Sequence, residues 1–167
     1  KDWRAVIIGD EKREKIRLNH RNATILGFKK HYEVLNIFKK TSITVACSRW
    51  DEPFGRTSLE ASANGCAVII TNKGGLPETV TDAKILRELN EKNLTKSISN
   101  LIDDKKTRKD LQRKSIQNFY LTHKFVSKKI DDYRSEKLFL EKTFYIKSSL
   151  KSLRILHVTN FNERLDG

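Results

Sequence analysis

SITVACSRWDEPFGRTSLEASANGCAVIITNKGGLPE, residues 42–78, is the stretch that decides the fold of this chain. Residues 44–47 and residues 66–70 are short apolar runs with the length of buried strands. Between them a helical pattern starts at Arg56 and presents a face of small residues. It stops at Gly65, because glycine can take the left-handed conformation of a helix end. We therefore expect a strand, a loop, a helix and a second strand in this order.

A second unit of the same kind follows the first. Gly74 and Gly75 predict a turn after the second strand, and Pro77 suits the first turn of another helix. Successive strand–loop–helix units predict parallel strands that are joined by right-handed crossovers. The sequence therefore predicts an α/β fold with a Rossmann-like parallel sheet and flanking helices.

The loops of both units lead into a helix N-terminus. In an open parallel sheet, ligands bind beyond the carboxyl ends of the strands, where such loops lie. The N–H groups and the dipole of a helix N-terminus suit a phosphate. Glu60 lies about a turn into the first helix, where its carboxylate would repel phosphate but can accept hydrogen bonds from a ribose diol. This combination predicts a sugar nucleotide as the ligand.

EPFGRTSLE, residues 52–60, resembles the E-x7-E motif of the retaining glycosyltransferases with a GT-B fold (family 4, glycosyl transferases group 1). ANGCAVII, residues 63–70, and GGLPE, residues 74–78, are similar to the segments that follow this motif in the family. The similarity extends more loosely from about Val6 to about Tyr133. It implies the C-terminal, donor-binding half of a GT-B fold, incomplete at its N-terminus.

The resemblance implies roles for the residues of this motif. Glu52 would be the catalytic-site residue that binds hydroxyls of the donor sugar, and Glu60 would bind the ribose. The backbone amides of Phe54, Gly55 and Arg56 would face the sugar and the phosphates. The Arg56 side chain would either pair with phosphate or cover the helix start.

Further candidates for donor binding lie outside the motif. Gly74 and Gly75 would give the donor access to the backbone. Phe28 and Lys29 occupy the loop that lies against the nucleobase in the family. Glu78 either lines the site or is an ordinary acidic residue at a helix start.

The sequence lacks the motifs of several other nucleotide chemistries. It has no G-x-G-x-x-G and no Walker A loop, so dinucleotide redox chemistry and ATP hydrolysis have no support. It also has no Asp-x-Asp and no His/Cys cluster with metal spacing, so we expect neither a metal nor a cofactor. Amides, helix dipoles and basic side chains would then neutralise a leaving diphosphate. The resemblance implies transfer of a hexose from a nucleoside diphosphate sugar, with retention at the anomeric carbon.

The composition fits a single domain. A chain of 167 residues with 37% hydrophobic content can form one core. No apolar run approaches the roughly 20 residues of a membrane span, and no signal peptide is visible. Cys47 and Cys66 lie in apolar strands and are expected to be buried, reduced thiols, which favours a cytoplasmic location.

The net charge of +13 is less specific. Residues 104–137 hold eleven lysines and arginines against five acidic residues. The aromatic residues there fall near helical spacing, which favours solvated helices and gives no support to nucleic acid as a partner. Peripheral contact with an anionic membrane, at its inner face, stays open. Two alternatives to a transferase therefore remain: a GT-B nucleotide-sugar epimerase, and a basic interaction module that binds anionic lipid or nucleic acid.

The remaining sequence predicts further elements. We expect strands at residues 3–9 and 23–27, a short solvated helix at 11–17, and helices at 31–40, 91–102, 106–121 and 124–140. His31 is interpreted as a helix-start or surface histidine rather than a catalyst.

Three parts of the chain are expected. Residues 1–140 form the nucleotide-sugar-binding domain with its C-terminal helices, and residues 141–152 form a linker. Residues 153–167 contain the apolar LRILHVTN and either begin a following domain or complete the present sheet. In the family, the Arg and Lys that clasp the diphosphate and the acceptor-binding domain precede the segment matched here. We therefore interpret the chain as a fragment that is inactive without its N-terminal GT-B domain.

Overall fold

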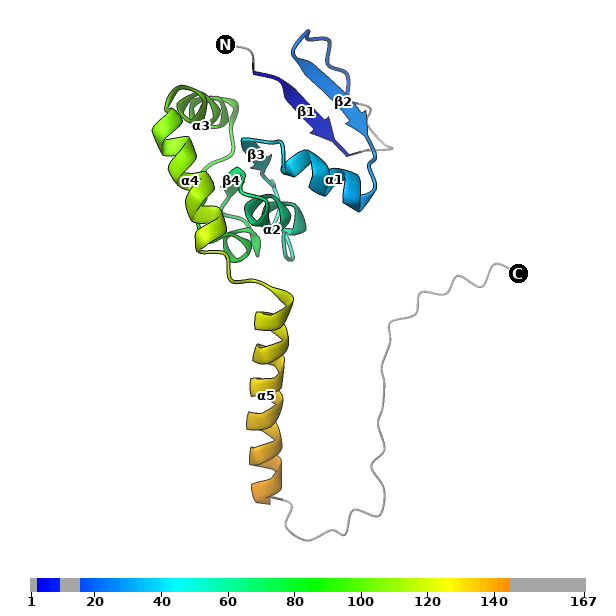
Figure 1. The fold of residues 1–167 in the computed structure, drawn as a ribbon, viewed down its shortest axis with the longest axis vertical. Coiled ribbons are helices and arrows are strands. Elements are labelled where there is room, and N and C mark those ends of the chain that lie inside the picture. Colours follow the sequence, from blue (N-terminus) through cyan, green and yellow to red (C-terminus); the bar gives the residue numbers. More distant parts are fainter. Residues whose placement is uncertain (1–2, 10–15, 145–167) are drawn as a thin grey trace, which may run out of the picture. The chain divides into compact units, whose positions relative to one another are not determined.

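The computed structural model describes residues 3–9 and 16–144 (Figure 1). The chain divides into two units, Lys1–Thr122 and His123–Gly167, and each is described by itself. Of the expected linker, residues 141–144 belong to a helix, whereas residues 145–152 lie outside the described residues. The expected strand within residues 153–167 lies outside them as well.

A two-stranded parallel sheet begins the first unit. Strand β1 (Ala5–Ile8) pairs with strand β2 (Ala23–Gly27), and Ala5 lies opposite Ala23. Both strands agree with the prediction. The short helix expected at residues 11–17 falls mostly outside the described residues, and its last two residues, 16 and 17, are not helical.

A three-stranded parallel sheet follows, with the order β3-β4-β5. Its strands are β3 (Ile43–Ala46), β4 (Ala67–Thr71) and β5 (Lys84–Leu86). The predicted α/β fold with parallel strands and flanking helices is confirmed, and in the described residues the strands form two parallel sheets. The sequence pattern predicts parallel strands without specifying which of them pair. Strand β5 was not predicted, because three residues that include an exposed lysine show no apolar run.

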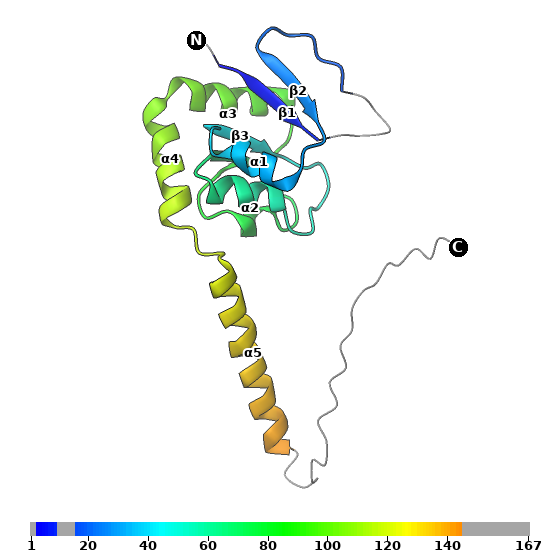
Figure 2. The same ribbon diagram turned by 45° about the vertical axis from the view of Figure 1, so that its right-hand side comes forward.

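Strand β4 is the core of the first unit, and all five of its residues are buried. Because side chains alternate along a strand, Val68 and Ile70 face one side and pack with Phe38 and Ala61. The other face carries Ala67 and Ile69, which pack with Leu86 of β5 and Leu101 of helix α3 (Glu91–Asp103). A strand that is buried on both faces is typical of a parallel sheet covered by helices on both sides. Figure 2 shows helices around β3, the strand that pairs with β4.

Helices α1 (His31–Phe38) and α2 (Arg56–Ala63) cover the first face. Helix α2 ends as predicted: Gly65 has φ +75°, its amide donates to the carbonyl oxygen of Ser62, and the Cys66 amide donates to that of Ala61. This pair of bonds is a Schellman ending. The helix expected after Pro77 is a single 3-10 turn, η1 (Leu76–Thr79).

Helices α3 (Glu91–Asp103) and α4 (Lys105–Gln117) cover the other face. Each begins at a residue whose side chain accepts a hydrogen bond from a first-turn amide. Asn90 accepts from the Asn93 amide at 2.8 Å, and Asp104 accepts from the Thr107 amide at 2.9 Å. The Thr107 hydroxyl also donates to Oδ2 of Asp104 at 2.6 Å, and this bond, together with that from the Thr107 amide, lowers the pKa of the Asp104 carboxyl group. The expected end of α4 at residue 121 is wrong, since the helix stops at Gln117.

The second unit contains helix α5 (His123–Phe144), close to the predicted 124–140. The side chains of residues 126–137 are exposed. Two of its aromatic rings lie beneath lysines one turn ahead: Lys129 is 5.9 Å from the Phe125 ring centre and Lys137 is 5.4 Å from that of Tyr133. None of the described helices is both long enough and apolar enough to cross a membrane.

Candidate active site at the carboxyl ends of the strands

Two loops that follow neighbouring parallel strands lie against each other. The loop after β3 carries Asp51 and Glu52, and the loop after β4 carries Gly74 and Gly75. The Gly75 amide donates a 2.7 Å hydrogen bond to the carbonyl oxygen of Glu52. The Gly74 amide donates to Oδ1 of Asp51 at 3.2 Å. The two glycines therefore fix the backbone of the segment that begins the E-x7-E motif.

The close approach of the two loops requires glycine at positions 74 and 75. Gly74 has φ +52°, and a Cβ built on it would lie 2.6 Å from the Glu52 nitrogen. A Cβ on Gly75 would lie 2.9 Å from the carbonyl oxygen of Pro53. Both distances are shorter than real Cβ contacts, and both neighbours are backbone atoms. The space beside these glycines is thus occupied by the other loop, which was not expected from the sequence.

A buried pair of hydroxyls holds the start of α2 against η1. Ser58 Oγ and Thr79 Oγ1 are 2.7 Å apart, and both residues are fully buried. Ser58 Oγ also lies 2.7 Å from the carbonyl oxygen of Gly55, and Thr79 Oγ1 lies 2.8 Å from that of Leu76. Each hydroxyl has one proton, so the pair donates two hydrogen bonds among these three contacts. Sequence reasoning missed this pair, because two small polar residues 21 positions apart give no pattern.

The N-terminus of α2 has no side-chain cap. Gly55 is the N-cap residue with φ +88°, and among the described residues no side chain caps the first-turn amides. These amides belong to the segment that was predicted to face the donor phosphates. Phe54 is half exposed and the Arg56 side chain is largely exposed, so this end of the helix opens to solvent. An uncapped N-terminus offers N–H donors and a positive dipole end to an anion.

Glu60 lies between two cationic or potentially cationic side chains. Its Oε1 accepts from Nε2 of His31 at 3.1 Å, and Nη2 of Arg56 lies 3.6 Å from the same oxygen. His31 is the first residue of α1 and is exposed, as predicted. Its contact with Glu60 was not predicted, because the two residues are 29 positions apart. Arg56, for which phosphate pairing was one expectation, pairs with Glu60 here.

The hydrogen bond between His31 and Glu60 joins two regions to which the sequence assigned related roles. Phe28 and Lys29 precede α1 in the loop after β2, and the Phe28 side chain is 75% exposed. These residues were predicted to lie against a nucleobase, and Glu60 to bind the ribose. The structure therefore brings the start of α1, with the loop that precedes it, to the surface of α2.

Two further glutamates complete the predicted set. Glu52 is partly buried and its backbone is fixed by Gly75. Glu78 lies in the first turn of η1, where its side chain is exposed and its amide donates to the Gly75 carbonyl oxygen. This position is that of an acidic residue at a helix start, which is one of the two roles expected for it.

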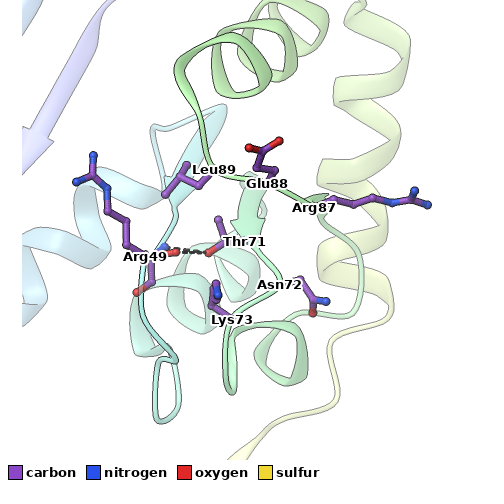
Figure 3. A pocket seen from close by; sticks show the side chains of 8 residues that line it. Arg49, Thr71, Asn72, Lys73, Arg87, Glu88 and Leu89 are labelled. Atoms are coloured by element: carbon purple, nitrogen blue, oxygen red, sulfur yellow. Dashed lines mark hydrogen bonds between the residues drawn. The ribbon is translucent and has the colours of Figure 1, made fainter.

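A cavity of about 260 Å³ opens beside these loops at the ends of all three strands (Figure 3). The residues that line it are Ser48, Arg49, Thr71, Asn72, Lys73, Arg87, Glu88 and Leu89. The Ser48 amide donates to Oγ1 of Thr71 at 2.9 Å, and this bond ties the ends of β3 and β4 together. Figure 3 shows the side chains of Arg49 and Arg87 pointing away on opposite sides. None of the predicted donor-binding residues lines this cavity.

The two cysteines take no part in the site. Cys66 is buried and Cys47 is half-buried, and both are free thiols. Burial raises the pKa of the Cys47 thiol and, outweighing a hydrogen bond with Thr44, that of the Cys66 thiol. Over residues 3–9 and 16–144 the structure holds no group of three or more His, Cys, Asp or Glu side chains that could bind a metal ion.

Comparison with solved structures shows what this arrangement resembles. The chain superimposes on Anabaena HepE in complex with UDP with a TM-score of 0.61 at 19% identity, covering 80% of this chain and 41% of that one. The same protein in complex with UDP-glucose gives a TM-score of 0.59 at 19% identity, with the same coverage. At this level of identity the likeness establishes the fold.

Sequence relatives point to a family. Spore coat protein SA of Bacillus subtilis is 29% identical over 98 residues, which is 56% of this chain and 26% of that protein. An uncharacterized glycosyltransferase of Methanocaldococcus jannaschii is 35% identical over 119 residues, or 66% of this chain and 34% of that protein. The chain thus spans about a quarter to a third of the length of these relatives. The family model for glycosyl transferases group 1 matches residues 1–118. The chain therefore belongs to the group 1 glycosyl transferases.

Proposed function

We propose that this chain is the donor-binding half of a retaining, family 4 glycosyltransferase that moves a hexose from a nucleoside diphosphate sugar. The observation that carries the proposal is the hydrogen bond from Gly75 to Glu52, which joins both glycine loops at the ends of parallel strands. Such a position is where open α/β sheets bind nucleotides. The complexes of the Anabaena structural neighbour with UDP and UDP-glucose support this class of donor.

In this proposal the residues of the E-x7-E motif and of the loop before α1 each have a role toward the donor. Glu52 binds hydroxyls of the sugar, and Glu60 binds the ribose diol. The amides at the uncapped start of α2, from Phe54 to Arg56, face the sugar and the diphosphate. Phe28, which is largely exposed, and Lys29 lie against the nucleobase.

The main requirement of the proposed reaction is stabilisation of the leaving diphosphate. Negative charge develops on its oxygens as the bond to the anomeric carbon breaks, and this charge must be stabilised. The first-turn amides of α2 and the guanidinium of Arg56 supply this stabilisation from the described residues, and we propose that no metal or cofactor is needed. Arg56, whose side chain is 75% exposed, would exchange its 3.6 Å contact with Glu60 for a contact with phosphate.

The remaining parts of the proposal concern the whole protein. The acceptor is bound by a second GT-B domain, and the present chain alone transfers no sugar. We propose a cytoplasmic enzyme whose exposed lysines on α5 allow peripheral contact with the inner face of the membrane. Incubation of the chain with radiolabelled donors should release no sugar beyond the rate in buffer. Turnover by the chain alone would contradict this part of the proposal.

Calorimetry with UDP, GDP and ADP tests the donor site. We expect one of these nucleotides to bind, and Glu60→Ala to weaken that binding about tenfold or more, because a charged hydrogen-bond acceptor is lost. Glu91→Ala removes an exposed carboxylate at the start of α3, outside the site, and serves as the matched control. Absence of binding by all three nucleotides, or equal binding by both variants, would overturn the proposal and favour a basic interaction module.

A further inference from the structure

Glu60 is held at one carboxylate oxygen only. The 3.1 Å bond from His31 Nε2 and the 3.6 Å approach of Arg56 Nη2 both fall on Oε1. Within the described part of the chain, no hydrogen bond or ion pair reaches Oε2. The side chain of Glu60 is 19% exposed, so this second oxygen belongs to a carboxylate that is mostly covered but open on one side.

His31 lies in the first turn of α1, and hydrogen bonds fix the backbone of this turn. Lys30 is the N-cap residue of α1, and its amide donates to Oε2 of Glu33 at 2.9 Å. The Glu33 and Val34 amides donate back to the Lys30 carbonyl oxygen. His31 is therefore the first residue of a turn whose backbone these bonds fix, and its imidazole contacts Glu60 of α2.

We propose that His31 is a positioning residue for Glu60, an inference that rests on the proposed function. By donating Nε2–H to Oε1, His31 fixes the plane of the carboxylate and presents Oε2 to a ribose hydroxyl. The terminal torsion angle of a glutamate side chain has no sharply preferred value, so a carboxylate without a hydrogen-bond partner loses rotational freedom when a ligand binds. A hydrogen bond from His31 that is already present removes this entropic cost before the nucleotide binds.

Arg56 cannot replace His31 in this role. Its side chain is 75% exposed and its nitrogen is 3.6 Å from the oxygen, beyond ordinary hydrogen-bond length. The imidazole can donate through Nε2 when the neutral ring has its proton on Nε2 and also when the ring is protonated.

Three variants of His31 distinguish a hydrogen-bond donor that positions Glu60 from a side chain that only fills space. In Gln the amide nitrogen lies near the place of Nε2, whereas in Asn it lies near the place of Nδ1 and stops short of Glu60. Ala removes the donor altogether. Because His31 is exposed at the first position of its helix, all three variants should fold, which circular dichroism checks.

Calorimetry compares UDP with 2′,3′-dideoxy-UDP, which lacks the ribose diol. We expect H31A and H31N to weaken UDP binding about 3- to 10-fold, H31Q to stay within about twofold, and none of them to change the binding of the dideoxy analogue. Nitrogen chemical shifts of the imidazole should also show a proton on Nε2 in the wild type, and these shifts should change in Glu60→Ala.

The outcomes distinguish this inference from the proposed function. If the wild type binds UDP better than the dideoxy analogue but all His31 variants bind UDP as well as the wild type does, the positioning role is overturned and the donor site stands. If H31A weakens both ligands equally, His31 acts on the nucleotide in another way and the inference is also overturned. If the wild type prefers neither ligand, the ribose role of Glu60 fails, and this inference fails with it.

Discussion

The amide of Gly75 lies 2.7 Å from the carbonyl oxygen of Glu52 and donates a hydrogen bond to it. This bond makes the loop after β4 a support for the loop after β3. The first glutamate of the motif is therefore placed by residues that follow it by more than twenty positions. Changes in the glycine loop should accordingly affect the position of Glu52 through this backbone bond.

Substitution of Gly74 should be much more costly than substitution of Gly27. Both glycines have positive φ, +52° and +62°, so alanine is strained at either position. A Cβ on Gly27 meets nothing within 4 Å, whereas a Cβ on Gly74 runs into the backbone of Asp51 and Glu52. We expect Gly27→Ala to cost about 1 kcal/mol of unfolding free energy and Gly74→Ala about 3 kcal/mol. Urea denaturation measures the difference, and equal costs would show that the two loops can separate freely.

Loss of one hydroxyl from the buried pair should loosen the start of α2. Ser58→Ala leaves Thr79 bonded to Leu76, and Thr79→Val leaves Ser58 bonded to Gly55. Each variant should lose about 1 kcal/mol of stability, and the double variant should lose less than the sum, because both changes remove the same bond.

Thr95→Val, at an exposed position of α3, is the control for this pair and should change stability by less than about 0.5 kcal/mol. Additive effects of the Ser58 and Thr79 substitutions in thermal unfolding would argue against a shared hydrogen bond.

The N-cap of α3 offers a test on the opposite face of the sheet. The Asn90 side chain accepts from the Asn93 amide at 2.8 Å, so Asn90→Ala should lower the unfolding free energy by about 1 kcal/mol. Asn90→Asp keeps an acceptor in place and should retain nearly the full stability. A wild-type denaturation midpoint for Asn90→Ala would mean that this bond contributes nothing to the fold.

The two thiols should differ in their reaction with iodoacetamide. Burial raises the pKa of both, so each is mainly protonated at pH 7.5, and the reactive thiolate becomes more abundant as the pH rises. Cys47 is half-buried, and it should react slowly in the native protein, faster at pH 9 than at pH 7.5. Cys66 is fully buried and should react only after unfolding. Mass spectrometry of the labelled peptides reports both rates, and native labelling of Cys66 as fast as that of Cys47 would contradict the structure.

The sequence predicted the elements that carry a periodic or apolar pattern. Strand β2, helix α2 and the glycine end at Gly65 lie where the pattern placed them. It missed β5, which is too short and too polar for a pattern, and it extended η1 into a full helix because Pro77 also begins longer helices. Strand pairing is decided by tertiary contacts, so the division into two sheets could not be read from local signals.

For the candidate site, the sequence supplied the residues but few of their contacts. The motif located Glu52 and Glu60, and the glycine loop followed at a fixed distance. The contact of His31 with Glu60 and the hydroxyl pair of Ser58 and Thr79 depend on how helices pack, and no sequence spacing encodes them. The cavity lined by Ser48 and Thr71 was missed for the same reason, since its residues come from the ends of three strands.

The most direct test of the donor site is a titration of the isotopically labelled chain with UDP, followed by nuclear magnetic resonance of the backbone amides. The account predicts that the largest shifts fall on residues 54–56 at the start of α2, on residues 28–31, and on Glu60. Shifts confined to the cavity beside Ser48, or to the basic helices α4 and α5, would contradict it.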